Sequence, residues 1–212
     1  EAVLSPVIEC EVIEHTINQR VEKITDDILK KEFDLLAFSA YIWNIEESLK
    51  VASVIKKARP EVKIIFGGPE VSYDVRDFLE DNNFIDFLLS GEGEESIFEL
   101  IKALQSNGDL DIRGLSYREG DQLTINDEIR LVEDLNIIPS PYKFLLDKYK
   151  AKGEDPYLSL KKECKNRIVY YESSRGCPFN CYFCLSSTIK KTRFFDINRV
   201  KEDLLLLIKA GV

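Results

Sequence analysis

The sequence predicts an α/β fold: a doubly wound parallel sheet of Rossmann type, followed by a linker and one further β/α unit. Short apolar runs alternate with segments of helical period between residues 7 and 106, which is typical of a parallel sheet with helices on both faces. Glycines end the runs at 62–66 and 84–89, and glycine is a strong signal for a turn. Residues 167–212 then read strand, loop and helix, one unit of a β/α barrel.

Four apolar runs in the first half have the length of strands. They are residues 7–13, 33–40, 62–66 and 84–89. The first run is only half alternating and is interpreted as a strand near a sheet edge, whereas the second is apolar almost throughout and is interpreted as buried.

Helices are predicted between these strands, where apolar residues recur at helical spacing. They cover about residues 21–29, 44–58 and 97–106. Asn44 followed by Glu47 resembles a capping box, and Pro60 ends that helix because proline disfavours helix in the residue before it.

The second half begins with a hairpin. Residues 112–125 read as two strands that turn at Glu119-Gly120-Asp121. Residues 126–166 contain three prolines and weak periodicity, so we expect a linker with short helices. A strand at 167–171 and a helix at about 198–210 complete the prediction. The predicted domains are residues 1–110, 111–166 and 167–212.

The sequence is expected to be a piece of a longer protein. It contains no methionine, its sheet lacks the strand that usually precedes the first one found here, and a complete β/α barrel needs about 200 residues or more. The final β/α unit is therefore interpreted as the start of a truncated barrel.

Composition limits the function classes. The 212 residues are 44% hydrophobic and 32% charged, with a net charge of −9 and a pI near 4.9. No segment approaches the roughly 18 apolar residues of a membrane span, so we expect a soluble, cytoplasmic protein with no membrane partner. The negative charge argues against nucleic acid as a partner.

Three cysteines form the most specific motif. Cys177, Cys181 and Cys184 are spaced C-x-x-x-C-x-x-C just after a predicted strand. Three thiolates can hold a [4Fe–4S] cluster and leave one iron open for a small molecule. A zinc site with Cys164 as fourth ligand stays an alternative, although structural zinc sites usually contain two close pairs of ligands. The odd number of five cysteines argues against a disulfide framework.

Three loops of the first domain form a second candidate site. In doubly wound sheets, ligands bind beyond the carboxyl ends of the strands, and glycines there let a ligand approach the backbone. Each loop by itself could be an ordinary turn, and Tyr41 and Trp43 could stack on a ligand or pack against protein. The glutamates at 92, 94 and 95 would repel a pyrophosphate, which argues against a dinucleotide fingerprint. The candidate cofactor-binding residues are Ser39, Tyr41, Gly67, Gly68, Pro69, Glu70, Gly91, Glu92 and Gly93.

The run from Arg175 to Cys184, R-G-C-P-F-N-C-Y-F-C, resembles the cluster loop of radical S-adenosylmethionine (SAM) enzymes. The resemblance implies that the three cysteines hold the cluster, that SAM chelates the open iron, and that Tyr182 and Phe183 lie against the adenine. It also implies reductive cleavage of SAM to a 5'-deoxyadenosyl radical, with flavodoxin or ferredoxin as electron donor.

The first domain resembles the cobalamin-binding domain that precedes the barrel in one branch of that superfamily. Ser39 and the pair Gly67-Gly68 match the serine and the glycine pair of that domain in type and spacing. The D-x-H-x-x-G motif of the family would lie before Glu1, and His15 does not match it. The whole arrangement is similar to anaerobic magnesium-protoporphyrin ester cyclases and cobalamin-dependent methylases, and closest to a bacterial subgroup whose substrate is unassigned.

These resemblances imply a radical SAM enzyme with possible use of cobalamin, acting as a methyltransferase or oxidoreductase on an unknown substrate. The piece alone is expected to be inactive. Two alternatives stay open: a degenerate cobalamin-type domain that serves as a docking platform, and a zinc-stabilised interaction module.

Overall fold

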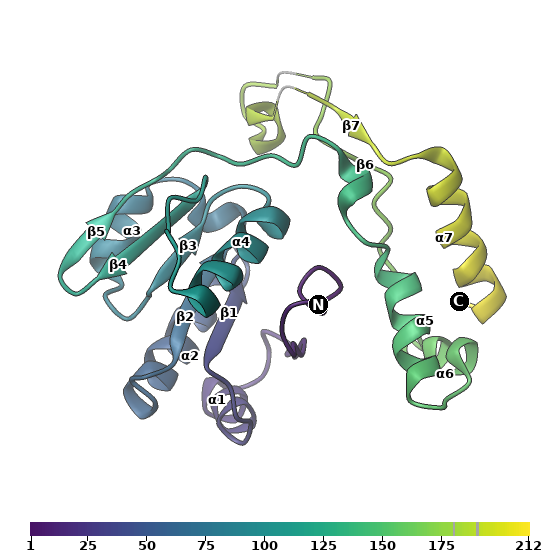
Figure 1. Cartoon of the computed structure of the whole chain (residues 1–212), viewed down its shortest axis with the longest axis horizontal. Coiled ribbons are helices and arrows are strands. Elements are labelled where there is room, and N and C mark those ends of the chain that lie inside the picture. Colours follow the sequence, from purple (N-terminus) through teal and green to yellow (C-terminus); the bar gives the residue numbers. More distant parts are fainter. Residues whose placement is uncertain (180, 190) are drawn as a thin grey trace. The chain divides into compact units, whose positions relative to one another are not determined.

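The computed structural model describes residues 1–179, 181–189 and 191–212 and divides the chain into two compact units, Val3–Val132 and Glu133–Val212 (Figure 1). The domain limits predicted at residues 110 and 166 remain predictions, because a compact unit need not coincide with a domain.

The first unit contains a five-stranded sheet in the order β1-β2-β3-β4-β5. Strands β1 (Leu35–Ser39), β2 (Lys63–Gly67) and β3 (Phe87–Leu89) are parallel, as predicted. Strands β4 (Leu115–Glu119) and β5 (Gln122–Thr124) form the predicted hairpin and extend the sheet antiparallel to β3. The hairpin is therefore part of the sheet.

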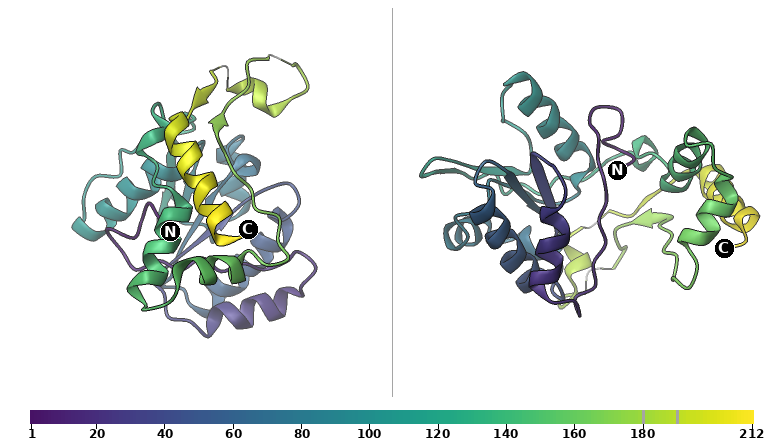
Figure 2. Two further views of the ribbon diagram at one scale, coloured as in Figure 1. Left: turned by 90° about the vertical axis from the view of Figure 1, so that its right-hand side faces the viewer. Right: turned by 90° about the horizontal axis from the view of Figure 1, so that it is seen from below.

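Helices cover both faces of this sheet, which confirms the α/β prediction (Figure 1, Figure 2). Successive strand residues point to opposite faces, so Ile64 and Phe66 pack with α1 (Val21–Leu29), α2 (Ile45–Ala58) and α3 (Val75–Asp81). Ile65 instead packs in a second cluster with α4 (Gly93–Ser106). The continuous apolar run of β2 is explained by this two-sided burial.

The predicted strand at residues 7–13 is wrong. This segment forms no strand or helix, and Val12 and Ile13 are exposed. An alternating pattern forms a strand only where one face can be buried and the backbone can pair, and no described strand pairs with this segment.

The second unit is mainly helical. It contains η2 (Leu135–Ile137), α5 (Pro141–Ala151), α6 (Pro156–Glu163), η3 (Leu185–Thr188) and α7 (Ile197–Ala210). Leu146, Leu160, Leu207 and Ala210 form its core. Asp155 caps α6 by accepting a hydrogen bond from Leu158 N at 2.9 Å, with proline in the first turn, as is typical of helix starts.

The predicted strand at 167–171 is also wrong. This segment forms no strand, and Ile168 and Tyr170 are 80% and 84% exposed. The ladder forms a few residues later, between β6 (Ser174–Arg175) and β7 (Arg193–Phe194). A strand needs a neighbouring strand for its backbone hydrogen bonds, and no described strand pairs with residues 167–171.

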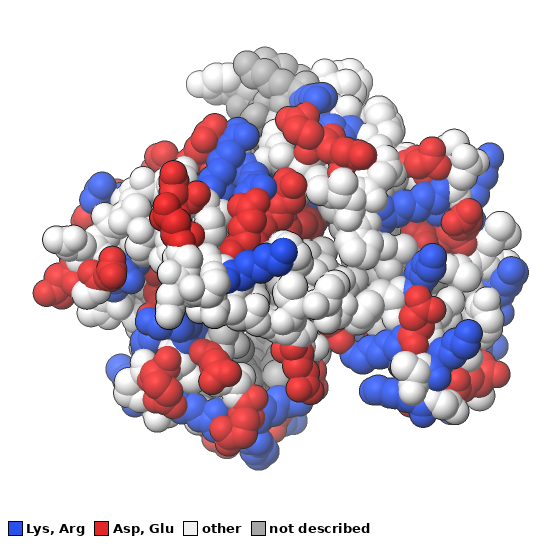
Figure 3. Space-filling model, viewed as in Figure 1, with Lys and Arg blue, Asp and Glu red and all other residues white. Residues whose placement is uncertain are grey.

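None of the helices in the described ranges combines the length and the apolar character that crossing a bilayer requires. On the face drawn in Figure 3, acidic side chains are interspersed with basic ones. This agrees with the sequence, which contains 38 Asp and Glu and 29 Lys and Arg residues.

Candidate functional site

The first candidate site lies where the three parallel strands end. The register pairs Ser39 with Gly67, and Gly67 with Leu89. The loops that follow these strands therefore begin side by side at one edge of the sheet. The structure thus brings together the three loops that the sequence indicated.

The loop after β1 is held by Asn44. The side-chain Nδ2 of Asn44 donates to Ser39 O at 2.9 Å, and its Oδ1 accepts from Tyr41 N at 2.7 Å. Asn44 precedes α2 but makes no side-chain cap hydrogen bond to that helix, so the predicted capping box is wrong. The amide closes the loop instead, since Asn readily forms such local bonds.

Two aromatic rings in this loop stack on each other. The ring centroids of Tyr41 and Trp43 are 4.7 Å apart with an interplanar angle of 8°. Trp43 is nevertheless 60% exposed, and Ile42 between them is 76% exposed. The loop therefore offers a flat aromatic and apolar surface at the edge of the sheet.

The conformations of Gly68 and Gly91 have a structural reason. Their φ angles are +120° and +88°, where side chains are strained. A Cβ on Gly68 would lie 2.5 Å from Ala40 O, and one on Gly91 would collide with the backbone of Arg130. The chain itself approaches both glycines, and their role as cofactor-binding residues stays a prediction.

Gly93 and Gly67 differ from that pair. A Cβ on Gly93 would meet nothing within 4 Å, whereas one on Gly67 would be in ordinary contact with Leu89 at 3.6–3.7 Å. Gly93 begins α4, and the amino end of a helix presents free backbone N–H groups and a positive dipole. A polar ligand group could therefore come close to the backbone at Gly93.

Glu92 has a structural partner. Its Oε2 accepts from Val132 N at 2.7 Å, and its backbone N donates to Arg130 O at 2.8 Å. Pro69 and Glu70 begin η1 (Pro69–Val71), and Glu70 is exposed. Their role as cofactor-binding residues stays a prediction.

Two serines at this edge were missed by the sequence analysis. Ser72 Oγ donates to Gly68 O at 2.8 Å and accepts from Gly91 N at 3.1 Å, so it joins two of the loops. Ser90 is 2% exposed, and its Oγ has no hydrogen-bond partner among the described residues. A buried hydroxyl without a partner is costly, and a polar ligand group could satisfy it. The signal was present in sequence, because Ser90 directly follows a buried strand.

His15 lies outside this edge. Its Nδ1 donates to Gln19 Oε1 at 3.0 Å, just before α1. This agrees with the sequence interpretation of His15 as an ordinary residue.

The second candidate site is the loop that contains the three cysteines. Its base is the β6–β7 ladder, which pairs Ser174 with Phe194 and Arg175 with Arg193. Phe195 N extends the ladder by donating to Ser173 O at 3.1 Å. Gly176 has φ +90°, and a Cβ there would collide with Lys191 O. The two ends of the loop are thus held together in a narrow neck.

None of the five cysteines forms a disulfide, and three lie within this loop. Cys177 and Cys184 are partly buried, Cys181 is exposed, and Cys184 N donates to Cys181 O at 3.1 Å. Asn180, which belongs to the same motif, lies outside the described residues. Within the described ranges, no three His, Cys, Asp or Glu side chains are arranged to hold a metal ion. The loop gathers the thiols without converging them on one point.

Cys164 is separate from this loop. It ends α6 and packs against the core of the second unit. Burial, followed by the charge of Glu163, raises the pKa of its thiol. Buried thiols with a raised pKa are poor metal ligands, so the geometry gives no support to Cys164 as a fourth zinc ligand.

The aromatic residues of the loop are uncovered. Tyr182 is fully exposed, Phe183 is 91% exposed and Phe179 is 70% exposed. Large apolar side chains in a group are seldom left exposed without a partner. Their exposure leaves their faces available to a flat ligand.

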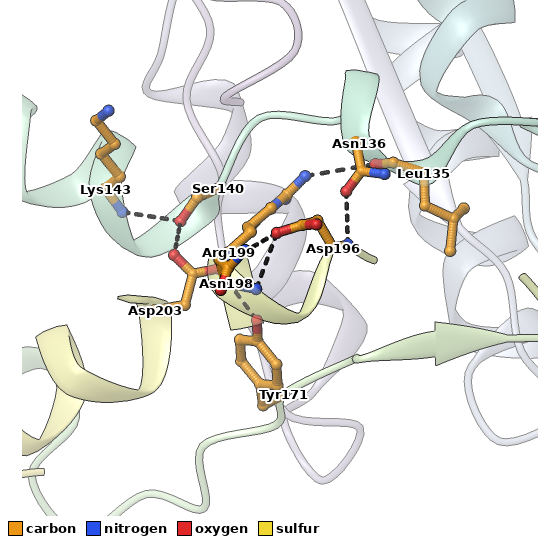
Figure 4. Close-up of polar contacts among 9 residues, drawn as sticks. All are labelled: Leu135, Asn136, Ser140, Lys143, Tyr171, Asp196, Asn198, Arg199 and Asp203. Carbon is orange, nitrogen blue, oxygen red and sulfur yellow. Dashed lines mark hydrogen bonds and ion pairs between the residues drawn. The ribbon is translucent and has the colours of Figure 1, made fainter. Parts of the chain in front are cut away.

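A polar cluster fixes the chain just before the loop (Figure 4). The carboxylate of Asp203 on α7 is 5% exposed and accepts from Ser140 Oγ at 2.5 Å and from Tyr171 Oη at 3.2 Å. Ser140 Oγ also caps α5 by accepting from Lys143 N. Burial, then the charge of Asp203 and the hydrogen bond to it, raise the pKa of Tyr171 to about 12.

A second set of contacts fixes the chain just after the loop (Figure 4). Asp196 caps α7 by accepting from Asn198 N at 2.8 Å and Arg199 N at 3.3 Å. Asp196 N in turn donates to Asn136 Oδ1 at 2.7 Å. The segment at 135–140, predicted only as linker, therefore holds both ends of the cysteine loop.

Comparison with known proteins follows the same division of the chain. Residues 4–101 match the family described as B12 binding domain. The chain is 31% identical over 189 residues to the cobalamin-dependent radical SAM methyltransferase TokK of Streptomyces tokunonensis, covering 87% of this chain and 26% of the relative. It is 27% identical over 170 residues to the anaerobic magnesium-protoporphyrin IX monomethyl ester cyclase of Cereibacter sphaeroides, covering 77% and 26%.

A solved structure shares the fold. The cobalamin-dependent SAM radical enzyme OxsB, with aqua-cobalamin and SAM bound, matches with a TM-score of 0.68 at 20% identity. The match covers 92% of this chain and 26% of that one. The chain thus spans about a quarter of the length of these relatives.

Proposed function

The chain belongs to the cobalamin-binding radical SAM family, and on this premise we propose that the whole protein methylates or oxidatively modifies a substrate using cobalamin, SAM and a [4Fe–4S] cluster. The observation that carries the proposal is the presence, in one chain, of a B12-binding-type sheet and of a loop with three cysteines outside any disulfide and a fixed neck. Methyl transfer is the first expectation, since the relative TokK is named a methyltransferase.

In this proposal the thiolates of Cys177, Cys181 and Cys184 are the cluster ligands. Three cysteines on one loop, none of them in a disulfide, supply the thiolates by which iron–sulfur clusters are held. The exposed rings of Tyr182 and Phe183 lie against the adenine of SAM and shield it from water. When bound, the cluster supplies an electron for cleavage of SAM, and cobalamin supplies methyl-group chemistry.

The loops at the end of the parallel strands bind the cobalamin. The unpartnered hydroxyl of Ser90 and the open space at Gly93 support this placement, because both fit a polar group close to the backbone. The stacked pair Tyr41–Trp43 offers an aromatic surface beside them. Flavodoxin or ferredoxin is proposed as the electron donor.

The test uses the full-length protein, purified and reconstituted without oxygen. Reduced protein should cleave SAM to 5'-deoxyadenosine or transfer its methyl group, and hydroxocobalamin should show a shifted spectrum on binding. A variant with all three loop cysteines changed to alanine is the matched control. An intact cluster that leaves SAM unchanged would contradict the proposal.

One observation favours a second candidate function, a docking platform. Gly68, Gly91 and Glu92 all have structural explanations that involve no ligand. Titration with hydroxocobalamin separates the two functions, because a docking platform leaves the corrinoid spectrum unchanged while SAM cleavage persists.

A further inference from the structure

We propose that residues 135–140 are a clamp that holds the entry and the exit of the cysteine loop at a limited separation and thereby presets its thiols for the cluster. Asn136 and Ser140 are the positioning residues of this clamp, because both act through residues that flank the loop and neither belongs to it. The inference rests on the proposed function, since the cluster is part of that function.

The ladder at the base of the loop is too short to hold the loop by itself. Strands β6 and β7 have two residues each and form a sheet of their own. One further hydrogen bond, from Phe195 N to Ser173 O at 3.1 Å, extends it. Two-stranded ladders alone are marginally stable in water, and Phe194 of this ladder is 69% exposed, so its burial adds little. The ladder therefore needs support from outside its two strands.

Asn136 supports the exit of the loop. Its Oδ1 accepts from Asp196 N at 2.7 Å, two residues after β7 ends. The amide is oriented for this contact, because its Nδ2 donates to Asp134 Oδ1 at 2.9 Å. Arg199 Nη1 adds a second contact by donating to Leu135 O at 3.4 Å. The start of α7 is thus joined to the clamp at two points.

Ser140 supports the entry of the loop through a carboxylate that it shares with Tyr171. Ser140 Oγ donates to Asp203 Oδ1 at 2.5 Å, and Tyr171 Oη donates to Asp203 Oδ2 at 3.2 Å (Figure 4). Hydrogen bonds to a charged group are stronger than those between neutral groups. Tyr171 lies three residues before β6 begins, so this contact fixes the chain just ahead of the ladder.

The clamp limits how far the two ends of the loop can separate. Asn136 and Ser140 are four residues apart in the sequence, so their Cα atoms are at most about 14 Å apart. When the short ladder opens, the clamp still keeps entry and exit together, and the three thiols stay near one another. Contacts that orient metal ligands from outside the ligand set typically change metal affinity by about 10–100-fold. The same consequence is expected for the clamp.

The experiment uses the full-length protein and two measurements. In reconstituted protein, the loss of cluster absorbance in excess EDTA gives the rate of iron release. In protein without cluster, hydrogen exchange of a peptide that contains Phe195 reports the opening of the ladder. The variants are Asn136→Ala and Ser140→Ala, and Ser140→Thr retains the hydroxyl. Asn198→Ala is the matched control, because Asn198 reaches Asp196 through its backbone N.

A further control separates the clamp from overall stability. Leu160 is fully buried in the core of the second unit, so Leu160→Val destabilises that unit without removing a hydrogen bond of the clamp. Asn136 is exposed, so Asn136→Ala is expected to fold and provides the result even if a variant at Ser140 does not.

We expect Asn136→Ala and Ser140→Ala each to release iron about tenfold faster than wild type and to exchange faster at Phe195. Ser140→Thr, Asn198→Ala and Leu160→Val should release iron at the wild-type rate. Wild-type release rates or wild-type exchange in both alanine variants of the clamp would overturn this inference alone. Release from Leu160→Val as fast as from these variants would also overturn it, because overall stability would then set the rate. A wild-type protein that takes up no cluster would instead overturn the proposed function.

Discussion

The hydroxyl of Tyr171 and the carboxylate of Asp203 meet at 3.2 Å although 32 positions separate them in the sequence. Tyr171 lies just before the cysteine loop, and Asp203 lies on the helix that follows it. Ser140 Oγ reaches the same carboxylate at 2.5 Å. This contact therefore connects the entrance of the loop, the helix after its exit and the start of α5.

Asp203→Ala should destabilise the second unit by about 1–3 kcal/mol, because it leaves the hydroxyl donors of Ser140 and Tyr171 without their acceptor. Urea unfolding followed by circular dichroism measures the change. Tyr171→Phe removes only one of the two hydrogen bonds and should cost less. Equal stability of wild type and Asp203→Ala would show that the carboxylate contributes nothing net.

The stability of the protein should also depend on Tyr171 at alkaline pH. Its pKa is raised from 10.0 to about 12 by burial, then by the charge of Asp203 and the hydrogen bond to it. A folded-state pKa above the unfolded value means that the contribution is complete below pH 10 and is lost as the pH rises towards 12. Tyr171→Phe should remove this part of the pH dependence, as measured by unfolding at a series of pH values. Identical alkaline profiles for both proteins would contradict the assignment.

Changing Cys177, Cys181 or Cys184 to alanine should each abolish retention of the cluster, because a three-thiolate site has no spare ligand. Iron and sulfide analysis after anaerobic reconstitution provides the measurement. Cys164→Ala is the matched control and should retain the cluster, since that thiol packs in the core of the second unit. Loss of iron in Cys164→Ala with intact folding would instead make Cys164 a fourth ligand of the cluster.

Gly91→Ala and Gly93→Ala should behave in opposite ways. At Gly91 the φ of +88° and the nearby backbone of Arg130 make a side chain costly, by about 1–3 kcal/mol. At Gly93 a methyl group meets nothing within 4 Å, so stability should be unchanged while hydroxocobalamin binding weakens. Thermal unfolding and corrinoid titration test the two effects separately. Unchanged cobalamin affinity in Gly93→Ala would place the ligand elsewhere.

Ser90→Ala should leave the unliganded protein as stable as wild type or slightly more stable, because it removes a buried hydroxyl that has no partner. If that hydroxyl binds cobalamin, the same substitution makes the free energy of cobalamin binding less favourable by the contribution of one hydrogen bond, about 0.5–1.5 kcal/mol. Titration with hydroxocobalamin measures it, with Ser106→Ala as a control at an exposed serine. Equal affinities of Ser90→Ala and wild type would remove Ser90 from the site.

The sequence predicted the parallel strands and helices α1, α2 and α4 because these elements follow simple periodicity, whereas the short helix α3 was not predicted. In β2 both faces of the strand are buried, as Ile64, Ile65 and Phe66 show. These three positions are therefore apolar, and such a continuous run is easily recognised in the sequence. The segment 7–13 has a similar composition but no partner strand, and pairing is not visible in a single sequence. Long-range partners decide between strand and extended coil.

The candidate sites were predictable to different degrees. The cysteine loop was recognised from spacing alone, whereas its supports were not, because Asp203 and Asn136 act through contacts across 63 and 60 positions. The glycines at the sheet edge were identified, but the close approach of the chain's own backbone to Gly68 and Gly91 was not. Nothing local in the sequence tells a glycine that faces a ligand from one that faces the chain's own backbone.

The close approach of Gly176 to Lys191 O makes the cysteine loop an interchangeable module. Since the flanking ladder and the contacts of residues 135–140 set the distance between entry and exit, we expect that residues inside the loop can be inserted, deleted or replaced without displacing α7. A graft of this loop onto another two-stranded ladder of the same register would carry its three thiols along. If relatives carry out different chemistry at the cysteine loop, we expect their sequences to differ between β6 and β7 while the surrounding scaffold stays the same.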